Sequence, residues 1–132
     1  MGAGESPKGQ MGGKVDLIMQ RFVDASAIGW VNYLYGNRKA ANAMMIQANP
    51  EMTEAEMEAS VALMKSQGIV DSGEAASKGI GAMNAGRVKD FHDQMVKAGL
   101  YKAGEVDLAQ VATYQFVNKG VGQDIKARLA GK

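Results

Sequence analysis

Cysteine is absent from this 132-residue chain, which excludes disulfides, thiolate zinc sites and cysteine nucleophiles. An excess of charge of one sign is absent too. Fifteen Lys and Arg against fourteen Asp and Glu give a formal net charge of +1, so we expect neither nucleic acid nor an anionic membrane as partner. No stretch reaches the roughly 18 consecutive apolar residues of a transmembrane helix, and we expect no membrane insertion. What remains is the composition of an ordinary globular domain.

The start of the chain differs in composition from the rest. Residues 1–13 are rich in glycine and lack the apolar run of a signal peptide. We predict a flexible Gly-rich leader over residues 1–13 and a single helical domain over residues 14–132. Without a signal peptide, the localisation of this chain stays open.

Apolar periodicity predicts an all-α fold. Over residues 14–35 the positions Val15, Ile18, Met19 and Phe22 recur at helical spacing, and Gly36 can end that helix. Further helices are expected over residues 37–47, from the capping box at 53–56 to Gly68, over 84–98, over 107–117 and around 121–129, with a loop over 69–83. We therefore expect a compact bundle of about five to six helices.

The second half of the first helix has almost no polar face. Such a segment is covered on all sides, either within the chain or by another polypeptide. Burial within the chain is the default, and association with a partner is the functional interpretation. The candidate association surface consists of Ile28, Trp30, Val31, Tyr33, Leu34 and Tyr35.

Motifs that carry chemistry are weak in this sequence. Gly79-Ile80-Gly81 lacks the third glycine of a dinucleotide-binding turn and indicates a flexible turn instead. His92 lies between Asp90 and Asp93, but adjacent positions on a helix point in different directions, so a structural histidine is the better interpretation. The ten methionines are more typical of core filling than of an adaptable groove.

An acidic run, Glu51, Glu54, Glu56 and Glu58, lies where a helix begins, and the helix dipole stabilises carboxylates there without a cation. We expect no catalytic residue, no metal site and no cofactor, and the sequence assigns no ligand-binding residue. An enzyme centred on His92 is the least favoured hypothesis.

Several short segments together resemble a known family. They are 20–26, 29–36, 49–53, 68–73 (GIVDSG), 79–83 (GIGAM) and 115–120 (QFVNKG). In this order they resemble the C-terminal region of solute-binding proteins of ABC transporters, in the class that includes pyrimidine, taurine, alkanesulfonate and nitrate binders. The resemblance extends from Val15 to Gly122.

The resemblance implies a fragment of a longer protein. Members of the family are two-lobed and periplasmic, bind a small organic or anionic solute between the lobes and deliver it to an ABC permease. Most of their ligand contacts lie upstream of the matching region. The chain would then be the C-terminal helical part of such a protein, truncated or excised and without catalysis, with apolar faces covered by the missing N-terminal lobes or by a second copy in a homo-oligomer. The alternative is a free-standing helical module for self-association or protein interaction.

Overall fold

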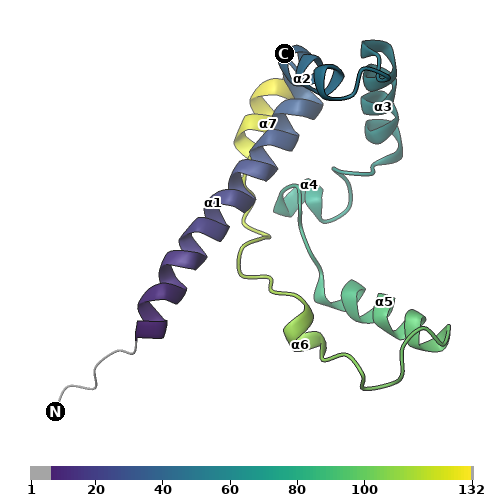
Figure 1. Ribbon diagram of the computed structural model, residues 1–132. Coiled ribbons are helices and arrows are strands. Elements are labelled where there is room, and N and C mark those ends of the chain that lie inside the picture. Colours follow the sequence, from purple (N-terminus) through teal and green to yellow (C-terminus); the bar gives the residue numbers. More distant parts are fainter. Residues whose placement is uncertain (1–6, 132) are drawn as a thin grey trace.

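The computed structural model describes residues 7–131, and every regular element in that range is a helix. The elements are α1 (Pro7–Tyr35), α2 (Lys39–Ala48), α3 (Glu54–Gln67), α4 (Ala75–Lys78), α5 (Ala85–Lys97), α6 (Leu108–Val111) and α7 (Gln123–Ala130). α1 runs along the length of the molecule. α7 lies beside its C-terminal half, α2 and α3 lie at that same end, and α5 and α6 lie towards the other end (Figure 1). The predicted all-α class is confirmed.

α1 begins earlier than the sequence predicted. Its first residue is Pro7, so residues 7–13 are helical and the prediction of a flexible leader is wrong for them. Proline suits the first helical position, since its φ angle is already helical and its missing N–H would have no partner there. Adding residues to an existing helix is also far easier than starting a new one. Residues 1–6, the rest of the predicted leader, lie outside the described residues.

Local capping signals were accurate. The Thr53 hydroxyl accepts a hydrogen bond from the Glu56 N–H at 3.3 Å, and the Glu56 carboxylate accepts one from the Thr53 N–H at 2.9 Å. This is the predicted capping box at the start of α3. Gly68 ends α3 with φ of 60°, and Asn84 and Asp107 accept backbone hydrogen bonds at the starts of α5 and α6.

The length of α6 was not predicted correctly. The helix expected over 107–117 ends at Val111, and the chain that follows packs against other segments. α4 is a single turn inside the predicted loop. The described residues therefore contain seven helices, two of them with four residues each, instead of the expected five to six.

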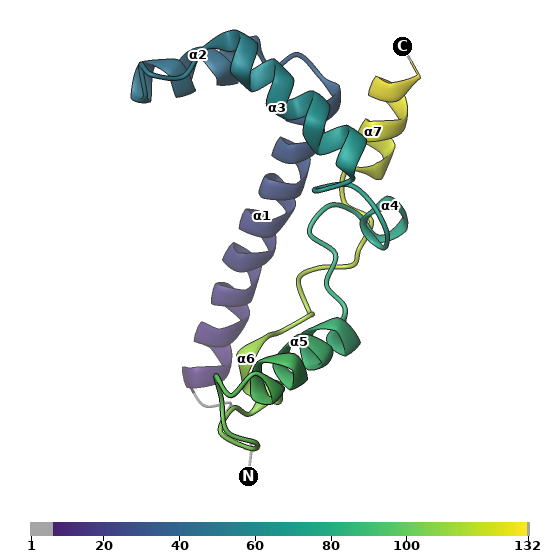
Figure 2. The same ribbon diagram turned by 90° about the vertical axis from the view of Figure 1, so that its right-hand side faces the viewer.

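The expectation of a compact bundle is wrong. The closest helix packing joins α1 with α7 and α2 with α3, while α5 lies apart from these pairs (Figure 2). The apolar core of the described part is small, formed by Ala27, Val31 and Leu34 of α1 with Met57 and Val61 of α3. Periodicity predicts which side of a helix is apolar, but not whether the chain has enough other segments to cover it.

A polar network holds α1, α2 and α3 together. Asn42 is fully buried; its side chain accepts a hydrogen bond from the Tyr33 hydroxyl at 3.0 Å and donates one to Glu54 at 3.0 Å. Arg38 donates two hydrogen bonds to the Glu58 carboxylate, at 2.7 and 2.9 Å, and others to backbone carbonyls at the end of α1. Such two-point pairing fixes orientation as well as distance.

Candidate functional site

Two of the six residues predicted as an association surface are buried, and the other four keep part of their surface exposed. Val31 and Leu34 are buried, with 2% and 1% of their surface exposed, so the prediction is wrong for these two. Ile28, Tyr33 and Tyr35 are partly exposed, and Trp30 is 42% exposed. α7 covers much of this helix half, since a Cβ on Gly122 would lie only 3.1 Å from a methyl group of Val31. The sequence predicted that this helix half is covered on all sides; the structure covers part of it with α7 and leaves Trp30 exposed.

Apolar side chains are also exposed on the other half of α1. We call Val15, Ile18, Met19 and Phe22 the outer stripe; their exposed fractions are 55%, 58%, 43% and 67%. Residues 13–19 are all exposed, so this part of α1 has little cover from the rest of the described chain. Their helical spacing was visible in the sequence, but the spacing alone resembled that of a core-facing helix.

The outer stripe faces away from the core. Phe22 and Val31 are nine residues apart, about two and a half helical turns, and so lie on opposite sides of α1. Ile18 and the buried Ala27 have the same separation. α1 thus carries one apolar face that the chain covers and another that it leaves exposed.

Loops from distant parts of the sequence meet beside α1 in what we call the central junction, formed by residues 68–83 and 115–123. The Asn118 amide accepts a hydrogen bond from the Met83 N–H at 3.0 Å and donates one to the Met83 carbonyl at 2.9 Å. The Gly120 N–H donates to the Lys78 carbonyl at 2.8 Å. The Gln20 side chain joins α1 to the junction by donating to the Phe116 carbonyl at 3.0 Å.

Gly79, the first glycine of the 79–81 motif, has a packing role here. Gly79 is buried with φ of 95°, and a Cβ there would lie 3.2 Å from the backbone N and O of Val121. A side chain would force these two backbones apart, and it would also be strained at this φ. The motif that could be mistaken for part of a dinucleotide-binding turn therefore allows two loops to touch.

A buried carboxylate lies at the end of the junction nearest α7. Asp71, whose side chain is 4% exposed, accepts a hydrogen bond from the Tyr35 hydroxyl at 2.5 Å and pairs with the Lys126 ammonium at 2.7 Å. Burial, reinforced by Asp71, raises the pKa of Tyr35 to about 12. Burial also tends to raise the pKa of Asp71, but Lys126 and Tyr35 outweigh it and hold that pKa below its usual range. Asp71 thereby connects α1, the loop after α3 and α7.

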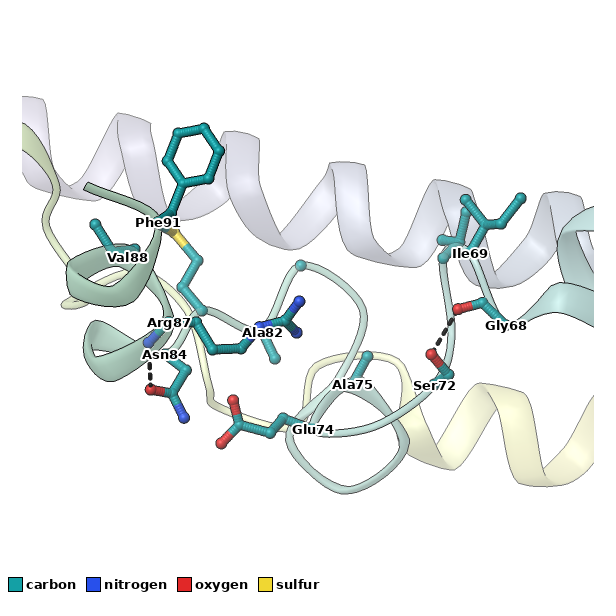
Figure 3. A pocket seen from close by; sticks show the side chains of 13 residues that line it. Gly68, Ile69, Ser72, Glu74, Ala75, Ala82, Asn84, Arg87, Val88 and Phe91 are labelled. Atoms are coloured by element: carbon teal, nitrogen blue, oxygen red, sulfur yellow. Dashed lines mark hydrogen bonds between the residues drawn. The ribbon is translucent and has the colours of Figure 1, made fainter. Parts of the chain in front are cut away.

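A cavity of about 600 Å³ opens between the loop after α3 and the start of α5 (Figure 3). This volume is within the range of small-ligand pockets, about 300–1,000 Å³. The Arg87 and Glu74 side chains both line it, together with apolar groups such as Val88 and Phe91. Glu74 is already paired with Lys78 at 3.0 Å, which lowers its pKa. The cavity has both charged and apolar walls, and its lining residues do not identify a particular ligand.

His92 lies against Tyr101 rather than in the cavity. The two rings stack with centroids 6.5 Å apart and planes 16° apart, and 15% of the His92 side chain is exposed. Asp93 is 3.5 Å from the ring but pairs with Lys89 at 2.5 Å, and this pairing lowers the pKa of Asp93. Asp93 therefore lies closer to the Lys89 ammonium than to the imidazole.

Three of the four carboxylates in the predicted acidic run have hydrogen-bond partners in the structure. Glu54, Glu56 and Glu58 hydrogen-bond to Asn42, Thr53 and Arg38 respectively. Across residues 7–131 acidic and histidine side chains do not gather in groups of three that could hold a metal ion. In the same range, no helix combines the length and the apolar character needed to cross a bilayer.

Comparison of the chain with models of known protein families, with curated proteins and with solved structures found no match.

Proposed function

We propose that this chain is the C-terminal helical portion of an ABC-transporter solute-binding protein and performs no reaction itself. The complete protein would bind a small organic or anionic solute between two lobes and present it to a membrane permease. Its closed state would be favoured by the free energy with which the solute prefers that state. The chain would contribute the helices that support one lobe.

The observation that carries the proposal is that the resembling segments contact one another. Segment 20–26 meets 115–120 through Gln20 and Phe116, and segment 79–83 meets 115–120 through Met83 and Asn118. Segment 29–36 meets 68–73 through Tyr35 and Asp71. Short segments that matched a family by chance would have no reason to pair in space, whereas segments that build one structural unit would.

The outer stripe also supports the proposal. An incomplete lobe leaves exposed the helix faces that its missing segments would cover, and the outer stripe is such a face. In the complete protein it would pack against the sheet of the lobe, as helices do in two-layer and three-layer α/β folds.

A chimera tests the proposal. Residues 14–132 would replace the corresponding C-terminal segment of a taurine-binding member of the family, and taurine affinity would be measured by titration calorimetry. We expect the chimera to fold and to bind taurine, since most ligand contacts in the family come from upstream segments.

The unaltered taurine-binding protein and the same protein truncated before the exchanged segment serve as controls. The truncated protein should bind taurine poorly or not at all. A chimera no better folded and no better at binding taurine than this truncated control would contradict the proposal.

A further inference from the structure

Burial divides the chain at residues 83 and 118. Over residues 13–131 the buried residues lie on α1, α2 and α3 or are Gly79 and Gly122, and residues 84–117 contain none of them. We call residues 84–117 the arm and the rest of the described chain the body. The arm carries α5 and α6, which lie near each other and apart from α2, α3 and α7 (Figures 1 and 2). A segment with few buried contacts separates from the rest of a protein at low free energy.

The two ends of the arm are held together at what we call its root, the pair of hydrogen bonds between Met83 and Asn118. The body is fixed up to this point, because Gly120 is hydrogen-bonded to Lys78 and Gly79 lies against Val121. Gly81 differs from Gly79: its φ is 86°, and no atom outside its chain neighbours lies within 4 Å of where a Cβ would be, so its backbone can rotate without a clash. A fixed base next to a few loop residues that can absorb a change of φ and ψ is the structure of a hinge.

We infer that the arm moves as one hinged unit about its root and that this movement opens and closes the cavity of about 600 Å³. The cavity lies beside the root, with one wall from the body and the other from the start of α5 (Figure 3). Movement of α5 therefore changes its width. The body provides Ile69, Ser72 and Glu74, and the arm provides Arg87, Val88 and Phe91. The inference concerns the described chain and does not rest on the proposed function.

The links between the arm and the body are weak or lie close to the root. Lys78 lowers the pKa of Glu74 most, and Asn84 and Arg87 of the arm lower that pKa further. The main partner of Glu74 is therefore in the body, and solvent screens the attraction of Arg87, because 35% of the Glu74 side chain is exposed. The hydrogen bond from Gln20 to the Phe116 carbonyl joins α1 to a residue only two positions before Asn118.

The arm has internal contacts that keep its shape. His92 on α5 stacks on Tyr101 in the loop that follows, and the Leu100 N–H donates to the Met95 carbonyl at 3.0 Å. The same loop is closed by the Lys102 N–H, which donates to the Glu105 carboxylate at 2.8 Å. The start of the arm and the loop after α5 are thus tied to each other, and not to the body.

Distances between pairs of spin labels, measured by pulsed electron paramagnetic resonance, test the movement. The chain has no cysteine, so two introduced thiols take both labels. The body pair is Leu63→Cys with Arg128→Cys, the arm pair is Lys97→Cys with Val111→Cys, and the cross pair is Leu63→Cys with Lys97→Cys. All four positions are exposed. We expect narrow distance distributions for the body pair and the arm pair, and a broader one for the cross pair.

The root is tested by Asn118→Gly, which removes both hydrogen bonds to Met83 while glycine accepts the φ of 64° at this position. The cross-pair distribution should broaden further. Asn37→Gly is the matched control: its amide also accepts a backbone hydrogen bond, from Lys39 at 3.1 Å, but it lies in the body between α1 and α2. It should leave the cross pair unchanged.

Three outcomes would overturn the inference. A cross pair as narrow as the body pair would show that the arm is rigidly attached, and an arm pair as broad as the cross pair would show that it does not move as one unit. Equal effects of Asn118→Gly and Asn37→Gly would show that the root is not the hinge. The first two measurements use an unaltered root, so they do not depend on how well Asn118→Gly folds.

Discussion

At the scale of single residues, Asp71 joins three separate segments of the described chain. It lies in a loop whose sequence shows no periodicity, yet it is the common partner of Tyr35 on α1 and Lys126 on α7. Its second carboxylate oxygen is buried and accepts no hydrogen bond from residues 7–131. A buried charge with two good partners is costly to disturb, since removing one partner leaves the other uncompensated.

The dependence of stability on pH follows from Asp71. Its pKa in the folded chain lies below the ordinary 3.8, so the unfolded chain binds more protons in acid. The stabilisation is complete above the ordinary value and is lost as the pH falls below about 4. Asp71→Asn should lower the free energy of unfolding at neutral pH by about 2 kcal/mol, because Lys126 loses its partner. Denaturant titrations at neutral pH and at about pH 3 measure both effects.

Tyr35→Phe is the control for this prediction. It removes one of the two groups that lower the pKa of Asp71 but keeps the ion pair with Lys126, so its loss of stability in acid should be smaller than that of the parent chain and larger than that of Asp71→Asn. If Asp71→Asn lost stability in acid as steeply as the parent, the attribution to Asp71 would be wrong.

At the scale of elements, α3 shows how closely a helix start can follow from sequence. Its capping box depends on two side chains three positions apart, and both hydrogen bonds form as the spacing indicates. The length of α6, in contrast, did not follow from sequence. The helix was expected to continue to residue 117 but ends at Val111, and residues 116–118 instead contact α1 and Met83. Local signals decide where a helix can begin, and tertiary contacts decide how far it continues.

Removing the cap of α3 should have a measurable cost. Thr53→Ala deletes the hydroxyl that accepts the Glu56 N–H hydrogen bond, and we expect the free energy of unfolding to fall by about 1 kcal/mol. Ser60→Ala is the matched control: its hydroxyl donates to the Glu56 carbonyl within the helix, and alanine is the better helix former. Chemical denaturation measures the free energy of unfolding of both variants. Equal losses would contradict the capping argument.

At the scale of the whole molecule, α1 has two halves with different surroundings. The C-terminal half is covered by α7 and contributes Ala27, Val31 and Leu34 to the core, whereas residues 13–19 are exposed. Regions with few buried apolar contacts open locally at low free energy. The stability of the first half of α1 should therefore depend on what covers the outer stripe.

Hydrogen exchange measures the opening of the two halves. The amides of residues 13–22 should exchange faster than those of residues 27–34, because fewer buried apolar contacts hold the first half in place. Equal protection of both halves would show that α1 opens as one unit, contrary to this expectation.

The sequence by itself determined the helical class, the starts of α3, α5 and α6 and the end of α3. These features depend on contacts within a few residues, which the side-chain pattern encodes directly. It also identified α1 as unusually apolar, and the segments of the central junction stood out through their resemblance to a family.

Only the tertiary structure decided which apolar residues are covered. Val31 and Phe22 are both apolar positions of one helix, yet Val31 lies against the start of α7 and Phe22 is 67% exposed. The placement of Asp71 between Tyr35 and Lys126, and of Gly79 against Val121, likewise joins residues far apart in the chain. Periodicity specifies the direction of a side chain relative to its own helix, whereas burial depends on segments elsewhere in the sequence that approach that side.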